Sequence, residues 1–275
     1  MRLKGPAPQQ QKPKVVKGLL IVLTITMLSS FGLGLWSSLA SGYSAVLRDE
    51  DIAMIQLDAP QSGQKAAIVH TSLGDMQFTL YPEECPQTVE NFCSLAESGY
   101  YNDTYVFELA PSVFFAAGAA TAAGDLPAGK EGTQQERIPQ ELSPKLWPFR
   151  GALCAMQTTT EGGFWKTLTK TQETYTGSRF LVCNSIEMTE EIEEGLRSVS
   201  SDAMKQVGEA FIEKGGIPNY AQQLTVFGQL TDGFDVLDAI TGAAVGDSET
   251  VADGVDVTRP KDEIRINSVE IVTLP

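Results

Sequence analysis

The stretch ECPQTVENFC, residues 84–93, decides the fold of this 275-residue chain. Pro86 suits the first turn of a helix, because that turn leaves its backbone N–H unpaired in any case. Apolar residues then recur at helical spacing until Gly99 stops the pattern: Val89, Phe92, Cys93, Leu95 and Ala96. The stretch therefore predicts one amphipathic helix with a single buried face.

Two short β-prone runs precede this helix, Ala66–Thr71 and Met76–Tyr81. The residues between them include Gly74, which a tight reversal of the chain favours. We expect a β-hairpin that leads directly into the helix.

More short strands are expected after the helix, and their ranges are Tyr105–Leu109, Val113–Ala117, Gly151–Met156, Phe180–Cys183, Thr225–Leu230 and Ile264–Val272. A second helix is expected from Asp232, a residue type that caps helices, with Phe234, Leu237 and Ile240 on one face. Many short strands with two helices predict a mainly β domain, built as a closed β-barrel capped by two α-helices.

The quoted stretch, with Gly74–Asp75 before it and Gly99–Asn102 after it, resembles the N-terminal third of a cyclophilin. In that family a hairpin leads into the helix that plugs one end of the barrel. Later segments resemble the family's glycine-led strand, its Asn-Gly-Ser-Gln-Phe segment and its Val-Phe-Gly strand, in that order: Gly151–Leu153, Thr176–Phe180 and Val226–Gly228. The resemblance implies a cyclophilin-like closed β-barrel over residues 66–275.

Two segments look like insertions into this domain, at about residues 157–175 and 184–220. The first contains Phe164 and Trp165, which either lie over the binding face as a recognition feature or tuck back onto the barrel. The second has Met204, Val207 and Phe211 at spacing i, i+3, i+7, which predicts one amphipathic helix or two. Its apolar stripe either packs on the barrel or binds a partner.

The N-terminal region has the pattern of a membrane anchor. Residues 1–17 contain five basic residues and no acid, and residues 18–40 are uncharged and long enough to span a membrane as a helix. Positive charge before the span favours a cytosolic tail, residues 1–17, and a type II orientation. Residues 41–65 then read as a stalk linker, and the endoplasmic reticulum or Golgi lumen is the favoured location for the domain. A cleaved signal peptide, giving a secreted protein, and an organellar membrane remain as alternatives.

Asn102 begins the triplet Asn102-Asp103-Thr104, which is an N-glycosylation acceptor if the domain faces the lumen. The sequence beyond residue 17 contains 15 basic and 35 acidic residues. Such an acidic surface repels phosphate backbones, so we expect no nucleic-acid partner.

No metal or other cofactor is expected, because His70 is the sole histidine and the four cysteines form no CxxC pair. Cys85 with Cys93, and Cys154 with Cys183, either form bridges or are buried thiols, and buried thiols are the favoured interpretation.

The resemblance also implies where an isomerase site would be. Rotation about a prolyl peptide bond faces a barrier of about 18–20 kcal/mol, and in cyclophilins an arginine is thought to donate toward the prolyl nitrogen. Glu108 stands at the position of that arginine, and residues 101–120 contain no arginine in any register. The family's glutamine and histidine become Ala116 and Leu224, and its tryptophan before the histidine is missing. An ionised glutamate accepts hydrogen bonds and cannot donate one to nitrogen.

What remains at these positions is apolar: Val113, Phe114, Leu181 and Leu224. They either accept a proline ring or another small apolar group, or are ordinary core residues around a filled site. Arg179 replaces a pocket glutamine, and we expect it either to pair with Glu108 or to remain a separate charge. A less favoured hypothesis has Arg179 replacing the lost catalytic donor.

Two functions follow from this interpretation. The favoured one is a membrane-anchored protein whose prolyl-isomerase fold is catalytically weakened or inactive. Such a domain binds proline-containing or apolar peptide segments, or is a scaffold in a membrane complex. The alternative is an active peptidyl-prolyl cis-trans isomerase that assists the folding of extracytosolic proteins.

Overall fold

The computed structural model describes residues 48–124, 137–159, 174–250 and 256–275. The strands are β1 (Lys65–Thr71), β2 (Gly74–Leu80), β3 (Thr104–Ala110), β4 (Phe114–Ala119), β5 (Ile138–Pro139), β6 (Ala152–Thr159), β7 (Thr174–Cys183), β8 (Thr225–Asp232), β9 (Glu249–Thr250), β10 (Asp256–Val257) and β11 (Arg265–Thr273). The helices are α2 (Pro86–Glu97), α4 (Glu190–Arg197), α5 (Asp202–Lys214) and α6 (Phe234–Thr241), with short 3₁₀ turns η1 (Asp49–Asp51), η2 (Ile55–Leu57) and η4 (Pro218–Tyr220).

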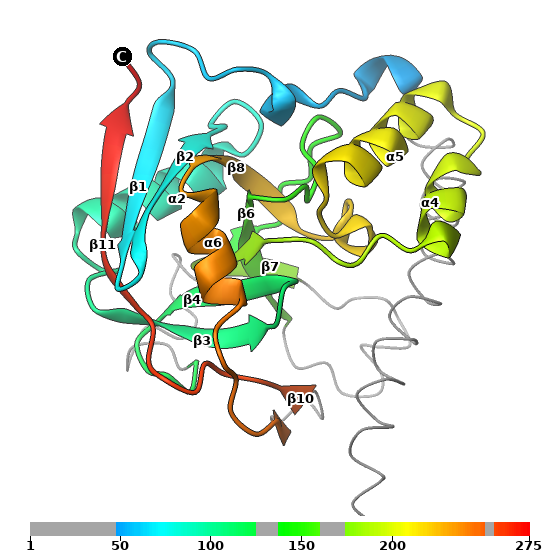
Figure 1. Cartoon of the computed structure of the whole chain (residues 1–275). Coiled ribbons are helices and arrows are strands. Elements are labelled where there is room, and N and C mark those ends of the chain that lie inside the picture. The colour runs from blue at the N-terminus through cyan, green and yellow to red at the C-terminus, as the bar shows by residue number, and fades with distance from the viewer. Residues whose placement is uncertain (1–47, 125–136, 160–173, 251–255) are drawn as a thin grey trace, which may run out of the picture.

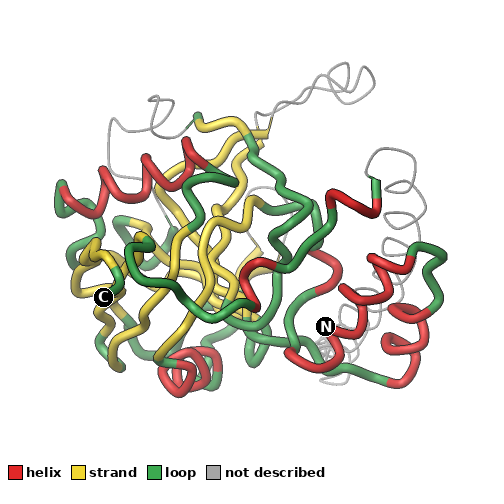
Figure 2. The backbone as a smooth tube through the Cα atoms, turned by 90° about the horizontal axis from the view of Figure 1, so that it is seen from above, coloured by secondary structure: helices red, strands yellow, loops and turns green. Residues whose placement is uncertain are grey.

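The main sheet closes into a barrel (Figures 1 and 2). Its strand order is β4-β3-β11-β1-β2-β8-β6-β7-β5, and β4 also pairs with β7. The first eight strands in this order therefore form a closed ring, and β5 lies outside it beside β7. The predicted closed β-barrel with capping helices is confirmed for the part of the chain that the structure describes.

Helix α2 buries the face that the sequence predicts. All five predicted apolar residues, from Val89 to Ala96, are buried in the barrel core. The ring of Phe92 lies 5.2 Å from that of Tyr101 and 5.2 Å from that of Phe227, measured between centroids. The Tyr101 hydroxyl donates to the Ser178 carbonyl at 2.9 Å, so the residues just after the helix also hold strand β7.

A residue far from α2 in the sequence provides hydrogen-bond acceptors for the N-terminus of this helix. The carboxylate of Glu141 accepts hydrogen bonds from the backbone N–H groups of Gln87 and Thr88 and from the Thr88 hydroxyl. These N–H groups have no partner inside the helix, and a negative charge at a helix N-terminus is favourable.

The N-cap of helix α6 lies one residue later than the proposed cap at Asp232. Gly233 is the N-cap residue, with φ of 92°, and Asp232 is the last residue of β8. A side chain at Gly233 would come within 2.3 Å of the Asp75 carbonyl oxygen. The close approach of α6 to the β1–β2 hairpin therefore requires glycine here, which residue propensity alone does not reveal.

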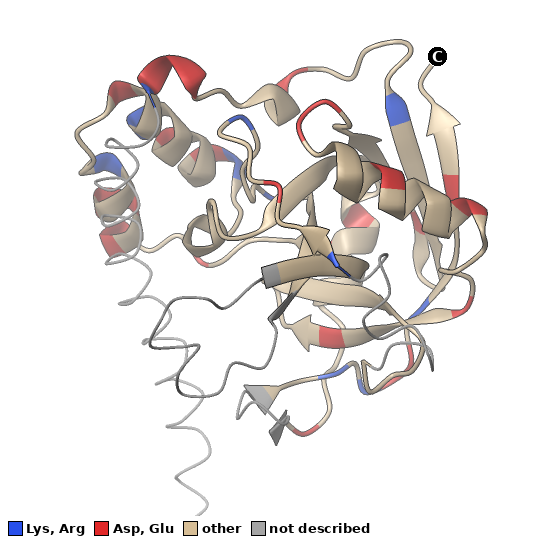
Figure 3. Ribbon diagram, turned by 180° about the vertical axis from the view of Figure 1, so that it is seen from behind, with Lys and Arg blue, Asp and Glu red and all other residues tan. Residues whose placement is uncertain are grey.

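The insertion at 184–220 contains two helices, α4 and α5, which Figures 1 and 2 show beside the barrel. The predicted stripe Met204, Val207 and Phe211 is buried, but against Trp147, Phe149 and α4 rather than in the main core. The rings of Phe149 and Phe211 lie 4.6 Å apart. The insertion thus forms a second small core attached to the barrel through residues 146–149. Its outer surface, with η1, carries many acidic residues (Figure 3).

Part of the predicted stalk is docked on the domain. We call residues 48–64 the strap. Gln56 in the strap is 5% exposed, and Ala53 accepts a hydrogen bond from the Trp147 indole at 2.7 Å. The predicted stalk is therefore not a free linker from residue 48 onward.

The other N-terminal predictions lie outside the described residues: the tail 1–17, the span 18–40 and the linker residues 41–47. Within the described ranges, no helix has the length and hydropathy of a membrane span. In the first insertion, residues 157–159 extend β6 and pair with residues 174–176 of β7. Phe164 and Trp165 lie outside the described residues.

Candidate functional site

Three of the predicted site residues lie in one row across the barrel. Glu108 of β3 pairs with Ala116 of β4, and Ala116 pairs with Leu181 of β7. Residues directly opposite each other in a sheet project from the same face. Their chain neighbours Leu109 and Phe115 are fully buried in the barrel core, so the row belongs to the outer face.

The apolar residues predicted for the site gather beside this row. Leu181 is buried, whereas Val113, Phe114 and Leu224 are half-buried and pack against the core from outside. We call this group, together with Glu108, Ala116 and Arg179, the barrel-face patch. Its half-buried members retain apolar surface that a ligand can contact. The side chain of Ala116 is only a methyl group, so it projects little from the sheet between them.

Tyr220 is a polar neighbour of this patch that the sequence did not predict. The ring of Tyr220 lies 6.2 Å from that of Phe114. Burial, together with the nearby charges of Cys183, Glu108 and Cys154, raises the pKa of Tyr220 to about 12. Its phenol is therefore protonated at neutral pH and can donate a hydrogen bond. The only sequence signal was its position, four residues before Leu224, in the region where the family's tryptophan is missing.

The surroundings of Glu108 shift its pKa toward the protonated form. Burial raises the pKa of Glu108 above its ordinary value, and the positive charges of Arg179 and Arg259 offset that effect only in part. A protonated carboxyl group donates a hydrogen bond, whereas a carboxylate only accepts. A protonated Glu108 can therefore donate a hydrogen bond, and an ionised Glu108 can only accept one.

Arg179 lies close to Glu108 but bonds elsewhere. Its guanidinium donates to the Gly124 carbonyl at 3.2 Å and lies 5.9 Å from the centroid of the Phe107 ring. Among the ion pairs of the described residues there is none between Glu108 and Arg179. Glu108 and Arg179 are therefore two separate charges, but both side chains are half-buried rather than fully solvated.

Two thiols lie beside the patch, because Cys154 pairs with Leu181 and Cys183 pairs with Phe114. Cys154 on β6 and Cys183 on β7 have sulfur atoms 3.8 Å apart, and both cysteines are free and fully buried. Burial, followed by the hydrogen bond and charge of Cys183, raises the pKa of Cys154. Cys85 and Cys93 are also free and buried, so the prediction of buried thiols is confirmed.

The remaining candidates lie outside the patch. Asn102 is exposed in the turn before β3, where Asp103 has φ of 59°. The described residues contain no group of three or more His, Cys, Asp or Glu side chains placed to hold a metal ion.

Comparison with known proteins gives a family match over most of the chain. The family model described as "Cyclophilin type peptidyl-prolyl cis-trans isomerase/CLD" matches residues 66–271.

Two curated relatives come from bacteria. A putative peptidyl-prolyl cis-trans isomerase of Staphylococcus saprophyticus is 30% identical over 219 residues, which cover 79% of this chain and 97% of the relative. A putative bifunctional phosphatase/peptidyl-prolyl cis-trans isomerase of Streptococcus pyogenes is 27% identical over 230 residues. That match covers 82% of this chain but only 42% of the relative.

Among solved structures, a Cryptosporidium parvum cyclophilin type peptidyl-prolyl cis-trans isomerase is 19% identical, with a TM-score of 0.49. The match covers 77% of this chain and 99% of that structure.

Proposed function

This chain belongs to the cyclophilin-type peptidyl-prolyl cis-trans isomerase family, and we propose that it uses the fold to bind apolar or proline-containing peptide segments with weak or no isomerase activity. The row Glu108–Ala116–Leu181 carries this proposal. Apolar surface remains beside the row, while an acid stands where the family's chemistry requires a cation.

Binding and catalysis make different demands on the patch. Val113, Phe114 and Leu224 can hold a proline ring by excluding water, and this needs no charge. Faster rotation about the prolyl bond requires a group that favours the twisted bond over the planar one. An ionised Glu108 has no proton to donate, so it cannot form a hydrogen bond to the lone pair that the prolyl nitrogen gains when the bond twists. Its negative charge also repels that lone pair.

The test measures the isomerisation rate of a proline-containing peptide with residues 48–275, which include the docked strap. We expect little acceleration by the unaltered protein, and chemical-shift changes at Val113, Phe114 and Leu224 when the peptide is added. Glu108→Arg is expected to gain activity, while Glu97→Arg, an equal charge reversal at an exposed position on α2, should gain none. Absence of peptide binding at the patch would reject the proposal.

The alternative function, an active isomerase, is favoured by one observation. Tyr220 and the protonated form of Glu108 are neutral hydrogen-bond donors beside the apolar surface. If they support catalysis, the unaltered protein accelerates isomerisation well above the uncatalysed rate, and the activity declines as Glu108 ionises with rising pH. Tyr220→Phe would then lower the rate without abolishing peptide binding.

We also propose that residues 18–40 anchor the chain as a single-pass type II membrane protein, with the domain in the endoplasmic reticulum or Golgi lumen. The uncharged span after five basic residues supports this topology. Translation of the full chain with microsomes should give a membrane-integrated product. Its glycosylation should disappear in the Asn102→Gln variant. A product cleaved near Ala40 and released into the lumen would support the secreted alternative instead.

A further inference from the structure

Two adjoining cavities lie beneath the strap, away from the barrel-face patch. One has a volume of about 460 Å³ and the other about 220 Å³. They share four lining residues: Ile55, Gln64, Tyr81 and Glu83. A single water molecule occupies about 30 Å³ in the liquid, so each cavity has room for a larger group. Neither cavity includes a residue of the patch.

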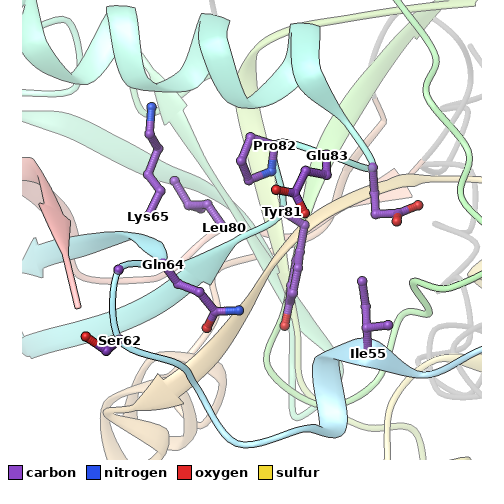
Figure 4. A pocket seen from close by; sticks show the side chains of 10 residues that line it. Ile55, Ser62, Gln64, Lys65, Leu80, Tyr81, Pro82 and Glu83 are labelled. Carbon is purple, nitrogen blue, oxygen red and sulfur yellow. The ribbon is translucent and has the colours of Figure 1, made fainter. Parts of the chain in front are cut away.

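The larger cavity has a mixed apolar and polar lining (Figure 4). Ile55, Leu80 and Pro82 line it, and Tyr81 extends from the end of β2 toward the strap between them. Lys65 is the cation among its lining residues, and Figure 4 shows its side chain extending away from Tyr81 toward α2. The region around the Tyr81 hydroxyl is therefore open to a positive group from a ligand.

Two carboxylates border the cavities without an ion pair. Asp58 lines the smaller cavity and Glu83 lines both, and neither appears among the salt bridges of the described residues. Glu84, in contrast, is already engaged by Lys145 at 2.7 Å. Burial and the charge of Asp58 both raise the pKa of Tyr81, so its hydroxyl stays protonated beside these acids.

A buried hydroxyl also lacks a partner. Thr79 lines the smaller cavity and is 2% exposed, and its Oγ1 has no hydrogen bond to any described residue. Its strand neighbour Gln229 is bonded instead to Gln56 of the strap at 2.8 Å. A buried hydroxyl without a partner is unfavourable, so a ligand that bonds it would gain free energy at this position.

We propose that the adjoining cavities beneath the strap bind a guanidinium group carried on an aliphatic chain. The chain would lie on Ile55, Leu80 and Pro82, and the guanidinium would lie between Asp58 and Glu83. A guanidinium has five N–H donors and no acceptor, which matches two carboxylates and the oxygen atoms of Thr79 and Tyr81. The group can belong to a small molecule or to an arginine of a peptide.

The test titrates the full chain, solubilised in detergent, with N-acetylarginine amide by isothermal calorimetry. N-acetylcitrulline amide has nearly the same shape without the charge and is the matched control ligand. We expect the arginine compound to bind at least tenfold more tightly and to weaken with added salt. Equal binding of the two compounds would overturn the proposal.

Variants locate the binding. The double variant Asp58→Asn with Glu83→Gln should weaken it at least fivefold, whereas Glu97→Gln with Asp235→Asn, an equal charge change at exposed positions, should leave it unchanged. Thr79→Val is a second, independent probe, because it should raise the melting temperature yet weaken binding. Unchanged affinity in the Asp58 and Glu83 variant would reject the site.

A peptide arm distinguishes the source of the guanidinium. If a short peptide with one arginine binds more tightly than N-acetylarginine amide, the cavities accept a side chain of a protein. If the peptide does not bind while the small compound does, the ligand is a free small molecule. Failure of every guanidinium compound to bind would overturn the inference and leave the proposed peptide binding at the barrel-face patch unaffected.

Discussion

Gln56 forms hydrogen bonds to both backbone groups of Trp147. Its side-chain amide donates to the Trp147 carbonyl at 2.7 Å, and its side-chain oxygen accepts from the Trp147 N–H at 2.6 Å. The same amide also donates to the Gln229 side chain. One strap residue thus connects the second core, which contains Trp147, with strand β8.

Replacing this residue should loosen the strap. Gln56→Ala leaves the buried Trp147 N–H and the Gln229 side-chain oxygen without partners, whereas the Trp147 carbonyl keeps its bond from the Phe149 N–H. Each buried group without a partner costs about 1–3 kcal/mol. We expect the free energy of unfolding of residues 48–275 to fall by about 2–4 kcal/mol, measured by urea denaturation. Gln87→Ala, at an exposed position on α2, is the control and should change stability by less than about 0.5 kcal/mol. An equally small change for Gln56→Ala would show that the strap is not held by these bonds.

Glu108 should destabilise the fold when it is ionised. Burial raises its pKa in the folded state, so its contribution to stability is complete below the unfolded pKa and is lost as pH rises through the folded pKa. Glu108→Gln removes this titration. The variant should be more stable than the unaltered protein at pH 7, and the difference should shrink toward pH 4. Thermal unfolding across this pH range measures it, with the exposed Glu270→Gln as control. A constant difference at all pH values would contradict the explanation.

The structure shows why the fold was easier to predict than the site. The pattern of α2 is local, because each of its buried residues lies within two turns of the next, and the barrel follows from strand order. The docked strap depends on Gln56, whose partner Trp147 lies 91 residues away, so no short pattern reveals it. Gly233 is likewise required by a carbonyl from a different element.

The pKa shifts at the patch could not be predicted from the sequence for a similar reason. Glu108 lies opposite Ala116 in the sheet, but its pKa depends on burial and on Arg179 and Arg259, which are far from it in the sequence and near it in the fold. Tyr220 was missed because it ends an insertion that has no counterpart in a minimal cyclophilin. Its contact with Phe114 arises only when η4 folds against the barrel.

Leu224 should matter more for binding than for stability. The side chain is half-buried at the patch, so Leu224→Asp places a charge where a peptide's apolar group would lose its contact. We expect peptide affinity to fall at least tenfold, or about 1.4 kcal/mol, with a smaller loss in the free energy of unfolding. Leu73→Asp, at a leucine that is 45% exposed in the β1–β2 turn, should leave affinity unchanged. Equal effects of the two variants would mean that the peptide binds elsewhere.

The four cysteines should resist alkylation in the native protein. All are buried and free, and burial, with added charge effects, raises the pKa of Cys85 to about 12. Because the thiolate is the reactive form, iodoacetamide at pH 8 should modify none of the four natively and all four in urea, as counted by mass spectrometry. Ser94→Cys, on the exposed face of α2, should add one rapidly modified thiol. Rapid native modification of Cys154 or Cys183 would show that the patch opens to solvent.

Glu84 should make the fold sensitive to acid. Burial alone would raise the pKa of Glu84, but hydrogen bonds from Lys145 and Ser143, both at 2.7 Å, outweigh it and lower the pKa. Stability from this group is therefore present above its unfolded pKa and is lost as pH falls through the lower, folded pKa.

Glu84→Gln should consequently reduce the free energy of unfolding by about 1–2 kcal/mol at pH 7, since the hydrogen bonds to a charged acceptor are lost. Lys145 is 43% exposed, so solvent screens part of the attraction and keeps the expected loss at this modest size. Urea denaturation at pH 7 and pH 3 measures the effect, and the loss should be much smaller at pH 3. The exposed Glu90→Gln is the control for removing a charge from this region. If Glu84→Gln were equally destabilising at both pH values, its effect would come from packing rather than from the ionised carboxylate.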